Sequence, residues 1–185
     1  MTALTHAERA SLLRLARDGL CRALRGDGAV RPALHGALAS RASAFVTLTV
    51  EGSLRGCTGA LRPRVALGRL IPRLAASSAL DDPRFRPLPS SDLARTRIEI
   101  SVLSDFVPSI GDAVVPGVHG VVVERGGRHG LLLPQVAVDH GFSREDFLEA
   151  ACRKAGLAPD DWRDPMVEIS VFTADVFSEP MAVMA

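Results

Sequence analysis

Residues 44–61 read AFVTLTVEGSLRGCTGAL, and this stretch decides the fold class. Its first seven residues, 44–50, are β-branched and aromatic, a composition typical of a β-strand. Glu51 and Gly52 predict a tight turn, and residues 53–61 then predict the returning strand of a hairpin. Two strands joined by so short a turn are antiparallel, because parallel neighbours need a long crossover. The chain is therefore expected to be built on antiparallel hairpins.

Further strands follow along the chain. Residues 97–104 alternate apolar and polar side chains, the pattern of a half-buried strand. Residues 119–134 predict a second hairpin, with Gly126 and Gly127 at its turn. Residues 167–173 predict a last strand, with the same alternation of apolar and polar side chains as residues 97–104. These elements together indicate a mainly antiparallel sheet structure.

Helices are predicted beside these strands. A capping box of Thr5 and Glu8 begins the first helix, and residues 143–155 form the clearest apolar stripe of the chain. Residues 65–80 also have helical spacing, but an interior proline costs about 3 kcal/mol outside the first turn. Pro72 therefore predicts a kink or a late helix start. The fold class predicted is α+β, with flanking helices set between hairpins, rather than a parallel doubly wound sheet.

The composition is that of an ordinary globular chain. Its 185 residues are 47% hydrophobic and 23% charged, and a chain of this length forms one domain, or one domain with two lobes. No apolar run approaches the roughly 18–20 residues of a membrane helix, and the start has no signal-peptide pattern. We therefore expect a single domain over residues 1–185, cytoplasmic and unprocessed. A net charge of +1 favours no nucleic-acid partner.

The three cysteines differ in their surroundings. Cys152 lies on the apolar stripe of the 143–155 helix, and Cys21 lies beside the stripe of the first helix, so both are predicted to be structural. An odd number of widely spaced cysteines argues against a disulfide scaffold and a structural zinc site. Cys57 stands apart, because it lies between two glycines and two residues after an arginine.

Six short motifs carry a family resemblance. They are LRGCTGAL, DDPRF, IEISVLS, HGVVV, GLLLPQVAVDHG and CRKAGL, in this order along the chain. The set closely resembles the AMMECR domain family, which in prokaryotes is component A of the AmmeMemoRadiSam system. The resemblance covers roughly residues 8–180. It implies an α+β fold with two unequal lobes around a cleft, and it places the segment containing Cys57 beside that cleft.

The resemblance also implies partners. Members of the family are encoded beside, or fused to, a Memo-like protein related to extradiol dioxygenases and a radical-SAM protein. The biochemical activity of the family itself is not established. Two positions depart from the family pattern. Thr58 stands where an apolar residue is common and adds a hydroxyl that needs a partner, which predicts a wetter face there. Pro72 stands where the family pattern continues a helix.

The segment around Cys57 is the first candidate site. If residues 53–61 are extended, Arg55, Cys57 and Gly59 point to one face. A fixed cation beside a thiol favours the reactive thiolate, and Gly56 with Gly59 leaves open backbone for a ligand or a strand to approach. We expect this segment, Thr58 included, to bind a small anionic ligand or a partner. The structural alternative is a bulge in which the cysteine is an inert filler.

Two other functions remain open from the residues. The first is a cysteine-dependent enzyme, with Cys57 as nucleophile, Arg55 holding the thiolate and His119 as general base. Glu99 interrupts an apolar strand and is most simply a solvent-facing residue. If it points into the cleft instead, it completes a triad-like or metal-binding set with Cys57 and His119. The spacing of these residues is not diagnostic of a metal, and no metal or cofactor is predicted.

The second is an interaction module. Residues 55–86 carry seven arginines against two acidic residues. Such a surface suits a protein or nucleic-acid partner, although a solvated helix face is the simpler explanation. Few aromatic residues lie among the arginines, so nucleic acid is the less favoured partner.

Overall fold

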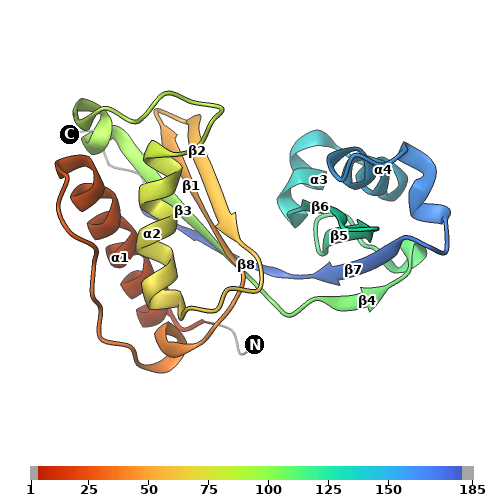
Figure 1. Ribbon diagram of the computed structural model, residues 1–185, viewed down its shortest axis with the longest axis horizontal. Coiled ribbons are helices and arrows are strands. Elements are labelled where there is room, and N and C mark those ends of the chain that lie inside the picture. The colour runs from red at the N-terminus through yellow and green to blue at the C-terminus, as the bar shows by residue number, and fades with distance from the viewer. Residues whose placement is uncertain (1–3, 181–185) are drawn as a thin grey trace. The chain divides into compact units, whose positions relative to one another are not determined.

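The computed structural model describes residues 4–180 and contains two compact units. The first unit is made of residues 4–102 and 175–180, and the second of residues 103–174. Within the described residues, each unit contains one four-stranded antiparallel sheet (Figure 1). The predicted α+β class is confirmed. No helix in residues 4–180 has both the length and the apolar character needed to cross a membrane.

The first unit packs two helices against one face of its sheet (Figure 1). The strand order is β2-β1-β3-β8. The elements are α1 (His6–Arg25), β1 (Ala44–Val50), β2 (Ser53–Ala60), α2 (Leu67–Leu80), β3 (Thr96–Leu103) and β8 (Ala174–Ser178), with short 3-10 helices η1 (Gly36–Ala39) and η2 (Ser90–Arg95). β2 lies at one edge of this sheet.

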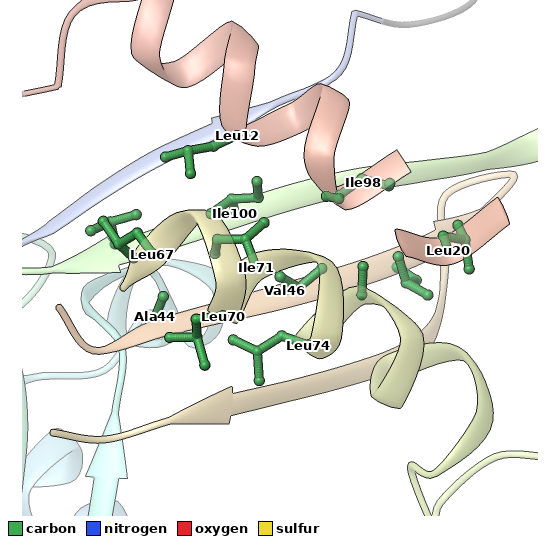
Figure 2. Packing of buried hydrophobic residues seen from close by; sticks show 14 of the residues in the cluster. Leu12, Leu20, Ala44, Val46, Leu67, Leu70, Ile71, Leu74, Ile98 and Ile100 are labelled. Carbon is green, nitrogen blue, oxygen red and sulfur yellow. The ribbon is translucent and has the colours of Figure 1, made fainter. Parts of the chain in front are cut away.

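Local signals in this unit act as predicted. The side chains and backbones of Thr5 and Glu8 form a reciprocal capping box at the start of α1. Glu51 and Gly52 form the hairpin turn with φ angles of 51° and 81°, the left-handed values that a two-residue turn of this type requires. Alternate residues of β1 and β3, including Val46 and Ile100, are fully buried beneath the helices (Figure 2). This alternation forms the first core.

α2 corrects one prediction. The helix begins at Leu67, ahead of Pro72, so the late start is wrong, and the alternative of a kink stays a prediction. The proline lies where α1 crosses closely: a Cβ on Gly19 would lie 2.3 Å from the Pro72 carbonyl oxygen. Burial of this contact offsets the backbone hydrogen bond that a proline cannot make. Tertiary packing therefore outweighs the local preference against the helix.

The second unit has its own sheet and core. The strand order is β4-β7-β5-β6. The elements are β4 (Val107–Ser109), η3 (Gly111–Ala113), β5 (Gly120–Arg125), β6 (Arg128–Leu132), α3 (Pro134–His140), α4 (Arg144–Lys154), η4 (Pro159–Arg163) and β7 (Glu168–Phe172). Its core is centred on Phe147, Leu148 and Cys152 of α4, which are fully buried. The structural role predicted for Cys152 is confirmed, and burial raises the pKa of its thiol.

In this unit, the turn between β5 and β6 and the end of α4 form as the sequence predicts. Gly126 and Gly127 form the two-residue turn between β5 and β6. Gly156 follows α4 with a φ of 70°, and the Leu157 N–H donates to the Cys152 carbonyl at 2.9 Å, as in a Schellman motif. α3, β4 and β8 are not predicted by the sequence pattern. Each is only three to seven residues long, too short for periodicity to reveal.

Candidate functional site

β2 contains a β-bulge, which determines the sheet face to which its side chains point. Leu48 pairs with Gly56 and Thr49 pairs with Leu54, so Arg55 has no partner on β1. A bulge residue interrupts the alternation of side chains along a strand. The prediction that Arg55 shares a face with the cysteine two residues later assumed unbroken alternation, and that assumption is wrong.

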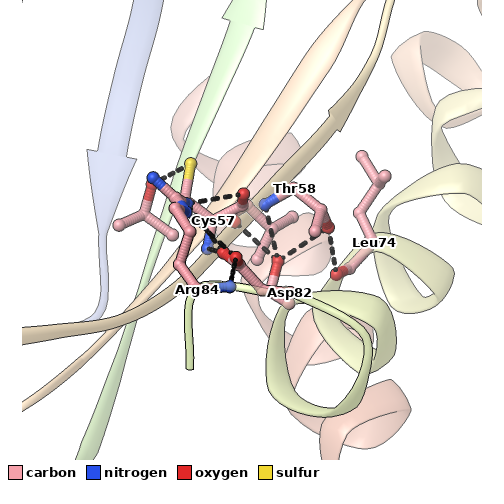
Figure 3. A network of polar contacts seen from close by, with 8 residues as sticks. Cys57, Thr58, Leu74, Asp82 and Arg84 are labelled. Carbon is pink, nitrogen blue, oxygen red and sulfur yellow. Dashed lines mark hydrogen bonds and ion pairs between the residues drawn. The ribbon is translucent and has the colours of Figure 1, made fainter. Parts of the chain in front are cut away.

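Beyond the bulge, Cys57 lies opposite Thr47. The Thr47 hydroxyl donates to the Cys57 Sγ at 3.3 Å, and the thiol points away from α2 (Figure 3). The residues on either side of the cysteine face the helix instead. A Cβ on Gly56 would lie 1.8 Å from the Ser78 carbonyl oxygen, so only glycine fits there. The half-buried Cys57 thiol is therefore on the sheet face that α1 and α2 leave uncovered.

Thr58 is tied to α2 and β1 through Ser78. The Thr58 hydroxyl donates to the Leu74 carbonyl at 3.1 Å and lies 2.8 Å from the Ser78 hydroxyl oxygen. The Thr58 N–H donates to Ser78 Oγ at 3.0 Å, and Ser78 Oγ donates to the Val46 carbonyl at 2.8 Å. Ser78 is 1% exposed. The wetter face predicted from Thr58 is wrong, because its hydroxyl finds partners within the protein.

The loop after α2 holds the peptide of Cys57 from the outer edge of the sheet (Figure 3). The Cys57 N–H donates to the Asp82 carboxylate at 2.8 Å, and Arg84 Nη2 donates to the Cys57 carbonyl at 3.2 Å. Arg84 also pairs with Asp82 at 2.7 Å. These hydrogen bonds hold the pKa of Asp82 well below its usual range, and those from Arg84 have the largest effect. Burial of the carboxylate opposes the shift. The Asp82 carboxylate in turn raises the pKa of Arg84.

Two more arginines lie at this loop. The Arg55 guanidinium donates to the Arg86 carbonyl at 3.2 Å and lies 5.9 Å from the centre of the Phe85 ring. Arg84 lies 5.4 Å from the centre of the same ring. We call Arg55, Arg84 and Arg86 the arginine corner. The cation that contacts Cys57 is thus Arg84, which sequence reasoning missed as a site residue. The signals for it were the DDPRF motif and the run of seven arginines over residues 55–86.

Glu99 and Gly59 lie on the same sheet as the thiol. Thr47 pairs with Cys57 on one side and with Glu99 on the other, so the three residues form a row across β2, β1 and β3. Side chains at such directly opposite positions are about 5 Å apart at Cβ. Gly59 lies opposite Phe45, whose ring would be 2.2 Å from a Cβ at that position. The space beside Gly59 is therefore filled by a ring.

The chain matches the AMMECR1 family model over residues 13–177. The match spans most of the chain. It includes the LRGCTGAL and DDPRF motifs, which contain Cys57, Asp82 and Arg84. The chain belongs to the AMMECR1 family.

Archaeal proteins of uncharacterised function are similar to this AMMECR1-family chain along nearly its whole length. A protein of Methanopyrus kandleri is 39% identical over 188 residues, which cover 95% of this chain and 90% of the relative. A protein of Methanothermobacter thermautotrophicus is 37% identical over 185 residues, which cover 95% of this chain and 96% of the relative. A crystal structure of an uncharacterised protein from Pyrococcus horikoshii is similar with a TM-score of 0.85 and 35% identity, covering 91% of this chain and 89% of that one.

His119 belongs to the second unit of this AMMECR1-family protein, whereas the other candidate residues belong to the first. The Val115 N–H donates to His119 Nδ1 at 3.2 Å, and the His119 N–H donates to the Val115 carbonyl at 2.9 Å. A neutral imidazole that accepts at Nδ1 carries its proton on Nε2, which is then a donor. The role of general base stays a prediction, and it requires the Val115 bond to break first.

The side chains that could hold a metal ion are dispersed. Within residues 4–180, no group of three or more His, Cys, Asp or Glu side chains is arranged to bind a metal. Cys21, Cys57 and Cys152 are all free thiols. The arginine corner presents guanidinium groups, which can bind anions, next to a half-buried thiol.

Proposed function

We propose that this AMMECR1-family protein is a cytoplasmic binding component of the AmmeMemoRadiSam system, acting with a Memo-like protein and a radical-SAM protein. The arginine corner would receive an anionic group of a ligand or of one of these partners. The observation that carries the proposal is the approach of two guanidinium groups, those of Arg55 and Arg84, to the Phe85 ring, next to a Cys57 peptide that Asp82 and Arg84 hold in place.

Two arginines of the corner, Arg55 and Arg86, remain available for an anionic ligand. Asp82 is 6% exposed and pairs with Arg84, so this carboxylate and this guanidinium compensate each other. Among the described residues, neither Arg55 nor Arg86 pairs with a carboxylate. A guanidinium has five N–H donors in a planar fork, and Arg55 uses one hydrogen bond to the Arg86 carbonyl. The remaining donors suit a carboxylate or a phosphate, which they can bind bidentately.

The proposal is tested by measuring the affinity of the purified protein for the purified Memo-like and radical-SAM proteins by surface plasmon resonance. The double variant Arg55→Glu/Arg86→Glu leaves the Asp82–Arg84 pair intact and is expected to bind at least tenfold more weakly. Arg41→Glu reverses an exposed arginine of the same unit outside the corner and should bind like the wild type. Equal affinity of the double variant and the wild type for both proteins would reject the proposal.

A cysteine-dependent enzyme is the second candidate, and the Thr47–Cys57 hydrogen bond favours it. A hydroxyl that donates to sulfur stabilises negative charge there. Iodoacetamide labelling of the folded protein, followed by peptide mass spectrometry from pH 6 to pH 10, tests this. We expect Cys57 to react more slowly at neutral pH in Thr47→Val than in the wild type, and at the wild-type rate in Arg55→Ala. A Cys57 that stays unlabelled, or that ignores the Thr47 change, would remove the enzyme from consideration.

A further inference from the structure

A cavity lies in the first unit, lined by α1, α2 and the segment that follows α1. Its volume is about 600 Å³, within the range of roughly 300–1,000 Å³ for small-molecule sites. Gly19 of α1 and Pro72 of α2 both line it, at the point where the two helices approach most closely. The interior proline, costly for a helix, thus forms part of a cavity wall.

Four arginines line this cavity from three directions. Arg69 and Arg73 project from successive turns of α2, Arg22 comes from α1, and Arg31 comes from the segment after it. Asp27 is the one acidic residue of the lining. Like charges four residues apart on a helix destabilise it by about 0.2–0.5 kcal/mol. The stability of α2 therefore gives no reason for two arginines at these positions.

These arginines also lack protein partners. Within residues 4–180, the side chains of Arg31, Arg69 and Arg73 make no hydrogen bond or ion pair, and the side chain of Arg22 makes only a long hydrogen bond of 3.4 Å to the Gly28 carbonyl. Several arginines elsewhere in the protein pair with acids. Examples are Arg9 with Asp175, Arg17 with Glu179, Arg84 with Asp82, Arg95 with Glu51 and Arg153 with Glu149. Four guanidinium groups that have no carboxylate partner among the described residues thus line one cavity.

The rest of the lining is apolar. Ala23, Val30, Pro32 and Ala76 lie between the arginines, together with Pro72. Small-molecule sites combine such an apolar surface with a few charged groups that fix orientation. Guanidinium groups converging from α1, α2 and a loop can bind several phosphate oxygens at once, and the apolar wall can take an uncharged ring.

We propose that this cavity binds a phosphorylated small molecule of nucleotide size, with its phosphates on Arg69, Arg73 and Arg31 and its uncharged part against the apolar wall. The site shares no residue with the arginine corner, so it is a separate binding function of the same unit.

The test is isothermal titration calorimetry of the full chain at low salt, with ADP, inorganic pyrophosphate and adenosine as probes. We expect ADP to bind more tightly than pyrophosphate, because it also contacts the apolar wall, and we expect no binding of adenosine. Arg69→Glu/Arg73→Glu should weaken ADP binding at least tenfold. Arg31→Glu changes a loop residue and no helix residue, and it should weaken ADP binding severalfold.

The matched control is Arg14→Glu, an exposed arginine on α1 outside the cavity, which should bind ADP like the wild type. Thermal unfolding without ligand verifies that each variant is folded. The proposal is overturned if ADP does not bind, if it binds no more tightly than pyrophosphate, or if both the double variant and Arg31→Glu bind it with wild-type affinity.

Discussion

Asp82 is the single residue on which the geometry at Cys57 depends most. Its carboxylate accepts the Cys57 N–H and three donors of Arg84, among them the backbone N–H. The carboxylate is almost fully buried, whereas the Arg84 side chain is 56% exposed. Arg84 therefore remains solvated if the pair is broken. The cost of breaking it comes mainly from the buried groups that lose a charged partner.

Asp82→Asn is expected to lower the free energy of unfolding by about 2 kcal/mol at pH 7, the range for hydrogen bonds to charged groups. Because the folded pKa of Asp82 is depressed, its charge stabilises the fold above the unfolded pKa of about 3.9, and this contribution is lost as the pH falls towards the folded pKa. The difference between wild type and variant should therefore be constant from pH 5 to pH 8 and shrink below about pH 4.

Urea unfolding at a series of pH values measures this difference. Asp81→Asn is the control, since Asp81 is the exposed neighbour in the chain and should change stability little at any pH. A wild-type advantage over Asp82→Asn that persists undiminished at pH 2.5 would contradict the assignment of a charged Asp82.

At the scale of elements, Ser78 fastens α2 to the edge hairpin. It is buried inside the helix, yet its hydroxyl bonds to the backbones of both β1 and β2, at Val46 and Thr58. An edge strand leaves part of its N–H and C=O groups without a strand partner. Here a helix side chain and the Asp82 carboxylate satisfy two neighbouring N–H groups of β2. The Asp82 carboxylate thereby binds the Cys57 N–H on the outer side of the edge strand, whereas Ser78 Oγ bridges the Thr58 N–H and the Val46 carbonyl of the two paired strands.

Ser78→Ala should cost about 1–3 kcal/mol of unfolding free energy, because it leaves two buried backbone groups without their partner. Thr58→Val should cost less than about 1 kcal/mol, since the Thr58 N–H and the Val46 carbonyl keep their bonds to Ser78. Guanidinium chloride unfolding of the two variants measures the order. Equal costs would contradict the view that the hydroxyl of Ser78 holds the strand more than that of Thr58 does.

At the scale of the whole molecule, the two units differ in how the chain builds them. The second unit is continuous, and Ser104 and Thr173 at its ends are joined by two hydrogen bonds of 2.9 and 3.0 Å. The first unit requires the returning chain, because β8 completes its sheet. Glu179 then pairs with Arg17 and accepts the Ile98 N–H at 3.0 Å. Each unit has a separate core.

Separate cores predict separate local unfolding. Glu179→Ala should accelerate amide hydrogen exchange in residues 4–102 and leave residues 103–174 at the wild-type rate. Asp164→Ala is the matched variant in the second unit, because Asp164 also pairs with one arginine and accepts one backbone N–H. It should accelerate exchange only in residues 103–174. Mass spectrometry of peptic fragments measures both, and a uniform increase along the chain would show that the units unfold as one.

Interactions between near neighbours in the chain were predictable. The Thr5–Glu8 cap, the Gly126–Gly127 turn and the ending at Gly156 each depend on groups within a few residues of one another. Their chemistry is therefore visible in a short window of sequence. The contact of Asp82 with Cys57 joins residues 25 apart. No local rule predicts such a pairing, and only the family resemblance drew attention to the loop.

The hairpin at residues 44–61, with its two strands and its turn, follows from β propensity and from Glu51-Gly52. The direction of the Cys57 thiol does not. A regular hairpin around that turn would pair Cys57 with Val46 and point it at the helices, and the bulge at Arg55 shifts the pairing by one residue to Thr47. A shift of one residue moves a side chain to the opposite sheet face. The packing of Gly56 and Thr58 against α2 selects that register, and packing between distant segments exists only in the folded chain.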